Sequence, residues 1–295
     1  MPAARRKSLI LLHAAVMLFG LSGVLGRGVS VSAVGVAWGR VVCSSCLLGL
    51  FLLIRRESLR LFSRRDGVWF VLAGAILALH WTAFFQSVQL ASVAVGTITF
   101  STYPLFLTAL EPLVYREPFR RADLLSSVLL LAGVAITVPA WSFSSQATIG
   151  LLWGMVGSFT YAVLTLFNRY FAARYSGVRT SFYEQAVAAA VLTPAALALW
   201  TAPSPGDVAA VGAIGVLCTA LAFSLFVTAQ RSVRAQTAGI VSGMETIYGI
   251  VFAWWFLGEP PTVRELLGGA VILSVAMAAS WRSARPELHR CERSE

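Results

Sequence analysis

The sequence predicts an all-α membrane protein: ten transmembrane helices arranged as two inverted repeats of five helices, with both termini in the cytoplasm. Three observations predict this fold. Hydrophobic residues make up 58% of the 295 residues and charged residues only 12%, whereas soluble domains carry about 25% charged residues. Ten apolar runs are long enough to cross a bilayer, and two stretches 142 residues apart resemble each other. A mean hydropathy of +0.77 leaves too few polar side chains to cover a water-facing surface, which excludes a soluble globular protein.

The ten predicted spans follow from the thickness of a membrane. A helix rises about 1.5 Å per residue, so about 20 apolar residues cross the hydrocarbon core. The runs are continuously apolar, which favours helices over barrel strands, where lipid-facing and inward residues alternate. In chain order the predicted spans are 8–26, 33–54, 68–88, 93–115, 124–141, 149–168, 181–200, 208–228, 238–257 and 266–281.

The first span follows three basic residues, as a secretory signal does. No small-residue cleavage site comes after it and nine more spans follow, so we expect it to be retained as a helix. The connections are short, with Pro203 and Pro205 before the eighth span and Pro260 before the tenth. They leave no room for a nucleotide-binding domain, and no G-x-x-x-x-G-K-[ST] motif is present, which excludes transport driven by ATP within this chain.

Orientation follows from the positive charges. The net charge is +10, which in a soluble protein would suggest nucleic-acid binding. Twenty of the 23 Lys and Arg residues lie in segments on the N-terminal side of the predicted membrane, Arg27 and Arg264 lie on the other side, and Arg40 lies inside a span. Because basic loops stay inside the cell, both termini are predicted to be cytoplasmic, and the charge is expected to face anionic lipid rather than nucleic acid.

An internal repeat divides the chain. Glu117-Pro118 recurs as Glu259-Pro260, and the same offset aligns Asp123 with Glu265. We therefore expect two copies of one unit, residues 1–147 and residues 148–295 with a short basic tail. Because each copy has five spans, the second copy enters the membrane from the opposite side. Inverted repeats of this kind build many secondary transporters, whose substrate sites lie near the midplane between the halves.

Ionisable residues inside the spans need a physical reason, because each charge costs roughly 2.5–3.5 kcal/mol at the centre of a helix. His80 and Arg40 fall at similar depth, about 20 Å from the cytoplasmic face for His80. His80 is either a substrate contact or proton carrier, or a neutral ring bonded to a carbonyl group. Arg40 and Glu245 are candidates for coupling or gating; the alternatives are snorkelling or internal pairing for Arg40, and bonding between helices for Glu245. Glu111 and Glu184 are expected to form surface ion pairs near the cytoplasmic face.

Aromatic side chains form the other group of candidate site residues. Tryptophan and tyrosine usually gather at membrane interfaces, so tyrosines at mid-depth suggest a face turned toward the protein interior. The expected substrate-binding residues are His80, Trp81, Phe84, Met17, Tyr103, Tyr161 and Tyr248. Such a lining suits neutral or zwitterionic molecules with apolar side groups. A substrate carrying phosphate would need several basic groups at this depth, and only Arg40 is available.

These features resemble a known family. The stretch His80-Trp81-Thr82-Ala83-Phe84-Phe85, the segments 91–94 and 103–105, and the Glu-Pro at the end of both repeats resemble the EamA branch of the drug/metabolite transporter superfamily. Within it the chain looks most like the YddG-type exporters of aromatic and other hydrophobic amino acids. One departure is that Thr246 stands where the first repeat has Pro104, so a proline hinge is expected in only one half.

The resemblance implies a carrier of the bacterial inner membrane that exposes its site to each side in turn. It is expected to export small neutral or zwitterionic metabolites, namely aromatic and other hydrophobic amino acids. A multidrug or nucleobase exporter of the same fold is the alternative. A membrane-embedded enzyme is disfavoured, because H-E-x-x-H, paired intramembrane aspartates and a G-x-S-x-G with a histidine are all missing from the sequence. The expected partners are a small-molecule substrate and the lipid bilayer, without cofactor, metal or nucleic acid, and the working expectation is a monomer.

Overall fold

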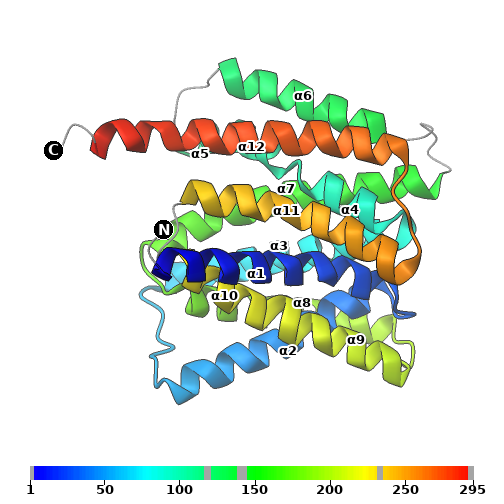
Figure 1. The fold of residues 1–295 in the computed structure, drawn as a ribbon. Helices are drawn as coiled ribbons and strands as arrows, with labels where there is room; N and C mark the ends of the chain where they lie inside the picture. The colour runs from blue at the N-terminus through cyan, green and yellow to red at the C-terminus, as the bar shows by residue number, and fades with distance from the viewer. Residues whose placement is uncertain (1–2, 116–120, 138–144, 231–234, 292–295) are drawn as a thin grey trace.

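The computed structural model describes residues 3–115, 121–137, 145–230 and 235–291, and these ranges contain helices and turns but no strand. Figure 1 labels the elements. In chain order they are α1 (Ala3–Arg27), α2 (Ala33–Ile54), α3 (Arg64–Leu90), α4 (Val93–Phe100), α5 (Tyr103–Tyr115), α6 (Arg121–Thr137), α7 (Gln146–Ala172), α8 (Gly177–Ala198), α9 (Pro205–Gly215), the π-helix η1 (Val216–Leu221), α10 (Ala222–Gln230), α11 (Ala235–Phe252), the π-helix η2 (Ala253–Leu257) and α12 (Val263–Cys291).

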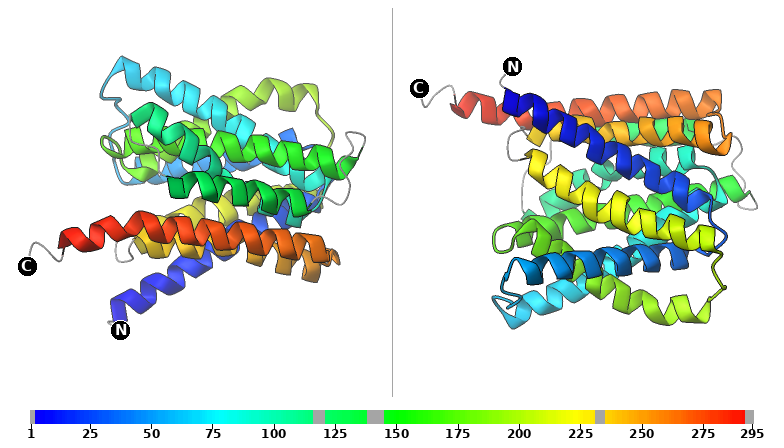
Figure 2. Two further views of the ribbon diagram at one scale, coloured as in Figure 1. Left: turned by 90° about the horizontal axis from the view of Figure 1, so that it is seen from above. Right: turned by 60° about the horizontal axis from the view of Figure 1, so that its bottom comes forward.

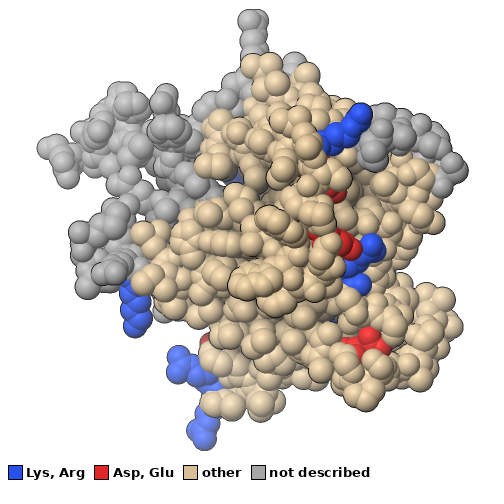
Figure 3. Space-filling view, turned by 45° about the vertical axis from the view of Figure 1, so that its right-hand side comes forward, with Lys and Arg blue, Asp and Glu red and all other residues tan. Residues whose placement is uncertain are grey.

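Within the described residues every predicted span contains one or more helices, and only residues 101–102 and 199–200 of these spans lie outside the helices. Five are long and apolar enough to cross a membrane, namely Lys7–Arg27, Ala33–Ile54, Arg64–Leu90, Gln146–Ala172 and Pro205–Phe226. Shorter apolar helices include Val128–Thr137 and Val241–Leu257. The end of the fifth predicted span, Trp141, and the first Glu117-Pro118 motif lie outside the described residues. The surface seen in Figure 3 is largely uncharged, as expected for helices that face lipid.

Successive helices run back and forth between two ends of the bundle. Figure 1 shows that α1 begins and α12 ends at the same end, on the left of the view. The loops after α2 and after α7 also lie there, and the other views agree (Figure 2). We call this the basic end, because Lys7, Arg56 and Arg174 belong to these segments. The cytoplasmic position of this end stays a prediction.

The fourth predicted span is divided into two helices at the position where the sequence predicts a proline hinge. Residues 93–115 form α4, which ends at Phe100, and α5, which begins at Tyr103. Proline lacks the N–H that an α-helix needs and disfavours helical backbone in the preceding residue, so Pro104 interrupts the helix. In the second repeat Thr246 takes its place, and α11 runs through this position without a break. The proline-dependent break thus occurs in one half only.

Contacts between the repeats occur in symmetry-related pairs. α2 packs on α8 and α6 on α12, each helix on its counterpart from the other repeat. α1 packs on α11, and the equivalent contact in the other half is that of α7 with α4 and α5. In the same way, the contact of α3 with α7 is equivalent to the contact of α10 with α1. Gly20 permits one of these approaches, because an added Cβ would lie 2.9 Å from the Glu245 carbonyl oxygen and the Gly249 nitrogen. Small residues at helix crossings are typical of membrane proteins.

Polar side chains join helix ends at the end opposite the basic end. Asp207 closes a capping box at the start of α9 and also accepts hydrogen bonds from the backbone N–H and hydroxyl of Ser30, at 2.8 and 2.6 Å. Glu265 caps α12 in the same way and accepts from the Ser92 hydroxyl at 3.0 Å. Each carboxylate therefore ties the start of a helix of the second repeat to the first repeat.

Candidate functional site

The helix break lies within a group of five aromatic rings, which we call the central aromatic cluster. It comprises His80, Trp81, Phe100, Tyr103 and Tyr161. The His80 ring lies 4.6 Å from Trp81 and 5.3 Å from Tyr161, measured between ring centroids. Tyr161 in turn lies 4.9 Å from Phe100 and 5.0 Å from Tyr103. The cluster thus combines rings of α3, α4, α5 and α7, from both repeats.

Hydroxyl groups hold the break in place. The Ser158 hydroxyl of α7 donates to the carbonyl oxygen of Phe100 at 3.2 Å and lies 3.0 Å from the Thr102 hydroxyl. On the other side, the Ser101 hydroxyl lies 2.7 Å from the hydroxyl of Thr246 on α11. The break is therefore connected to both neighbouring helices of the second repeat, which fixes the rings of Phe100 and Tyr103 beside those of α3 and α7.

His80 is buried, with 1% of its surface exposed. Its Nδ1 lies 2.9 Å from the carbonyl oxygen of Gly157, and because a carbonyl only accepts, Nδ1 carries the hydrogen. In the neutral ring Nε2 is then an acceptor, and it has no hydrogen-bond partner among the described residues. Buried polar atoms are almost always paired in proteins, so Nε2 of His80 marks a position where water or a ligand can bind.

Arg40 does not snorkel to the surface. It is 2% exposed, and its guanidinium carbon lies 3.3 Å from the centroid of Trp81, a cation–π contact. One nitrogen donates to the Ser22 hydroxyl at 3.2 Å, while Nε has no partner among the described residues. The structure thus places a buried positive charge directly against the central aromatic cluster.

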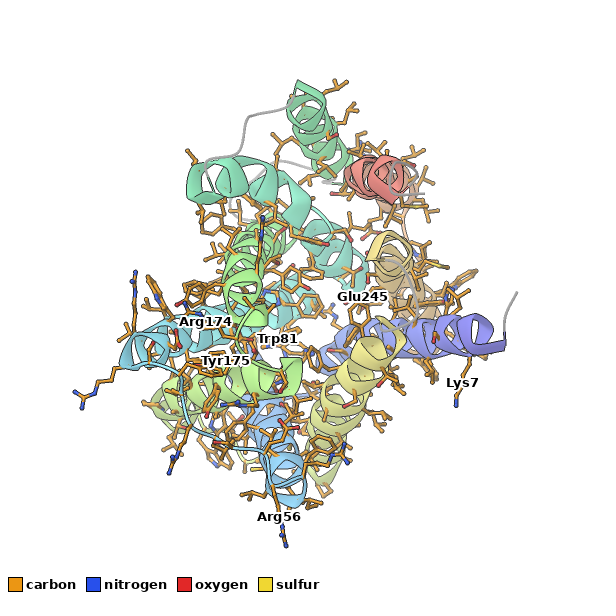
Figure 4. All side chains as sticks on the ribbon, turned by 90° about the vertical axis from the view of Figure 1, so that its left-hand side faces the viewer. Lys7, Arg56, Trp81, Arg174, Tyr175 and Glu245 are labelled. Carbon is orange, nitrogen blue, oxygen red and sulfur yellow. The ribbon has the colours of Figure 1, made fainter. Side chains whose placement is uncertain are left out.

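Glu245 provides the opposite charge. It lies on α11 beside Thr246, whose hydroxyl contacts Ser101 of the helix break. Within the described residues neither Glu245 nor Arg40 belongs to an ion pair. Figure 4, which looks along the bundle, shows Trp81 and Glu245 on the inner sides of their helices, facing the middle of the molecule. The site therefore combines a basic and an acidic side chain with a cluster of aromatic rings.

Of the other predicted residues, one packs on the cluster and two do not. Phe84 is 4% exposed, and its ring lies 6.0 Å from both Trp81 and Phe100. Tyr248 pairs with His13 of α1, its hydroxyl 2.9 Å from Nδ1, instead of joining the cluster. Met17 is 40% exposed, and no contact of the described residues connects it to the five rings.

Glu184 was predicted to form a surface ion pair, and that prediction was wrong. The residue is 6% exposed and its Oε1 has no hydrogen-bond partner among the described residues. It lies seven residues into α8, about 10 Å along the helix, where α8 packs closely on Gly74 of α3. Counting depth along a helix does not show which side of it a residue occupies. The side chain of Glu111 lies outside the described residues.

A second polar cluster, not predicted from the sequence, lies at the basic end. The carboxylate of Asp66 is buried and accepts hydrogen bonds from the hydroxyls of Tyr170 and Tyr175, at 3.0 and 2.8 Å. Arg174 also donates to it at 3.1 Å, and Figure 4 labels Arg174 and Tyr175. Burial raises the pKa of the Tyr175 phenol, so this group stays protonated and donates. The cluster joins the start of α3 to the end of α7. Nowhere in the described ranges do three His, Cys, Asp or Glu residues come together in a way that could hold a metal ion.

Comparison with known families identifies the chain. The model of the EamA-like transporter family matches residues 6–138 and again residues 148–281. The chain belongs to this family. It therefore has the two-repeat EamA architecture of a multi-pass membrane transporter, with a small-molecule substrate and a lipid bilayer around it. The family and its relatives point to transport rather than to an enzyme.

The relatives span most of the chain. An uncharacterized transporter of Archaeoglobus fulgidus is 26% identical over 68% of this chain and 71% of its own length. The uncharacterized transporter YwfM of Bacillus subtilis is 26% identical over 90% of each chain. An S-adenosylmethionine uptake transporter of Rickettsia conorii is 23% identical over 70% of this chain and 69% of its own length. A protein of known crystal structure has the same fold, with a TM-score of 0.63 and 17% identity over 96% of this chain and 99% of the other.

Proposed function

We propose that this EamA transporter exports small zwitterionic or neutral metabolites, first among them aromatic and other hydrophobic amino acids, from the bacterial cytoplasm by alternating access. The observation that carries the proposal is the pair of unlike charges, Arg40 and Glu245, on a cluster of aromatic rings. An amino acid has a carboxylate, an ammonium group and a side chain. The guanidinium of Arg40 suits the first, the carboxylate of Glu245 the second, and the rings suit an aromatic or aliphatic third.

Unpaired polar atoms in the site also favour binding, because a substrate would supply the hydrogen-bond partners that these atoms lack. Within the described part of the chain Nε of Arg40 has no hydrogen-bond partner, while the guanidinium stacks on Trp81 and donates to Ser22. A substrate carboxylate would use the unpaired Nε, and a substrate donor would reach Nε2 of His80. Each buried polar atom left unpaired costs about 1–3 kcal/mol, so a ligand that pairs with them regains part of the cost of its own desolvation.

Alternating access is expected to use the break between α4 and α5. Substrate sites of inverted-repeat transporters lie where helices are discontinuous. Here the break touches the cluster through Phe100 and Tyr103, and touches α11 through the Ser101–Thr246 contact. A movement of one repeat against the other would therefore shift the aromatic rings and Glu245 at the same time.

Substrate analogues test the two charges separately. Purified protein in liposomes is assayed with labelled phenylalanine, its amide, which lacks the carboxylate, and phenylpropionate, which lacks the ammonium group. The wild type should transport phenylalanine and discriminate against both analogues. Glu245→Gln should lose discrimination against phenylpropionate only, and Arg40→Met against the amide only. Equal effects of both variants on all three compounds would refute the assignment of the charges.

Direction, coupling and substrate class need their own measurements. S-adenosylmethionine, named for the Rickettsia relatives, also joins an amino-acid headgroup to an aromatic ring, so it belongs in the panel beside purines and cationic drugs. Faster flux of nucleobases or drugs than of amino acids would favour the alternative exporter. Proton coupling through His80 or Glu245 predicts that an imposed pH gradient drives accumulation, and flux indifferent to the gradient would leave facilitated transport.

A further inference from the structure

A hollow with a volume of about 300 Å³ lies on the flank of the bundle, away from the central aromatic cluster. We call it the flank pocket; its lining includes Gly35, Trp38, Cys43, Ala196, Trp200 and Gly212. These residues belong to α2, to the end of α8 and the turn after it, and to α9. Both α8 and α9 pack against α2 but have almost no contact with each other. The pocket is therefore a wedge between two helices, with α2 as its floor.

Three polar side chains of the flank pocket, those of Trp38, Ser32 and Asp207, are already paired. Trp38 donates its Nε1–H to the Thr193 hydroxyl at 3.0 Å. The Ser32 hydroxyl accepts from the backbone of Gly35 at 3.2 Å, and Asp207 is bonded to Ser30 and Ser204. A polar ligand would lose its hydration here without gaining these groups as partners, which is unfavourable. The chemistry of the lining therefore selects a hydrocarbon.

The dimensions match one half of a membrane. On α2 the lining runs from Ser32 to Cys43, about 17 Å of helix, and half of the hydrocarbon core is about 15 Å thick. At the outer part of the pocket Trp38 and Trp200 meet edge to face, 6.4 Å apart, and Trp200 is 56% exposed. Tryptophan at this level is typical of the membrane interface. The pocket thus extends from an interface to mid-membrane.

We propose that the flank pocket binds one acyl chain of a phospholipid from the leaflet opposite the basic end. The chain fills the wedge between α8 and α9 and packs on α2. The same stretch of α2 carries Arg40, whose side chain is buried on the inner side. The lipid therefore supports the helix that positions the cationic group, whatever the transported substrate is.

Photolabelling tests the site directly. The protein is reconstituted in phosphatidylcholine vesicles that contain a small fraction of phosphatidylcholine with a diazirine near the end of one acyl chain. After illumination, labelled peptides are mapped by mass spectrometry. We expect labelling of residues 31–43 and 196–212 to exceed severalfold that of Leu79, an exposed apolar residue of α3 at a similar depth. Equal labelling of the pocket and of Leu79 would overturn the proposal.

Two glycines allow the pocket to be filled without disturbing the fold. A Cβ added at Gly212 meets no atom within 4 Å, and one added at Gly35 comes no closer than 3.5 Å to its neighbours. Gly212→Phe and Gly35→Phe should each reduce the labelling severalfold. Gly177→Phe, at the other end of α8, where the nearest atom is 3.9 Å away, should leave it unchanged.

Unchanged labelling in both filled variants would refute the pocket as the site. A free aromatic diazirine without an acyl chain serves as the competing probe. If it labels the pocket as strongly as the lipid does in vesicles of excess phosphatidylcholine, the pocket binds small hydrophobic molecules and the acyl-chain assignment fails. Substrate flux is not used in these measurements, so their outcome is separate from that of the proposed amino-acid transport.

Discussion

Arg27 and Glu259 connect the two repeats at the end opposite the basic end. Nε of Arg27 lies 2.9 Å from Oε1 of Glu259, and the same guanidinium donates to the carbonyl oxygen of Gln89. The ends of α1, α3 and η2 are thereby held together. A transporter that opens this end must separate them, so the ion pair stabilises the state in which this end is closed. We predict that Glu259→Arg shifts the protein toward opening here.

The size of the effect follows from the exposure of the pair. The two side chains are 28% and 30% exposed, so solvent screens them and the attraction contributes about 1 kcal/mol. Replacing the attraction by a repulsion of similar size changes the equilibrium by about 2 kcal/mol, which is roughly 30-fold. The double variant Arg27→Glu with Glu259→Arg restores an ion pair of reversed polarity and should return the equilibrium close to that of the wild type.

Cysteine accessibility measures this equilibrium. Ser101→Cys in a background without the native cysteines places a thiol at the helix break, and a membrane-impermeant maleimide is added from the side of Arg27. Glu259→Arg should raise the labelling rate about 30-fold if opening limits access, and the double variant should bring it back down. If the double variant reacts as fast as the single variant, the pair does not hold this end closed and the reasoning is wrong.

Three further predictions concern the fold. Asp66→Asn removes a buried carboxylate that accepts from two tyrosines and an arginine, and should lower the free energy of unfolding by about 3 kcal/mol; in thermal unfolding in detergent the exposed Glu57→Gln should match the wild type. Gly20→Leu should lower the free energy of unfolding by about 3 kcal/mol through overpacking and abolish flux. Gly243→Leu should be tolerated, because no atom lies nearer than 3.9 Å to an added Cβ there. Expression level and flux of the two variants measure the difference. Pro104→Ala should extend α4 toward α5 and lower flux about tenfold with thermal stability unchanged; equal flux would remove the break from the transport cycle.

Much of this fold is readable from the sequence, because one physical requirement dominates it. Backbone groups in lipid must bond within their own helix, so a long apolar run is a helix, and the second run, 33–54, has the same bounds as α2. The rotation of each helix is harder to read. When all faces of a span are apolar, the sequence does not show which face points toward the protein interior. For this reason Glu184 was expected at the surface and Tyr248 in the cluster. Both residues are at plausible depths, but their helices turn them toward other neighbours.

The two repeats carry unlike residues at a level where they meet. In the first repeat Tyr103 and Pro104 break the helix and supply a ring, and the equivalent positions of the second repeat, Glu245 and Thr246, supply a charge and a hydroxyl on an unbroken helix. Two identical copies would have placed equal groups on both sides of the centre. A substrate with two unlike ends, such as an amino acid, needs unlike groups instead. Unlike residues at this level therefore allow a duplicated fold to bind an asymmetric molecule between its halves.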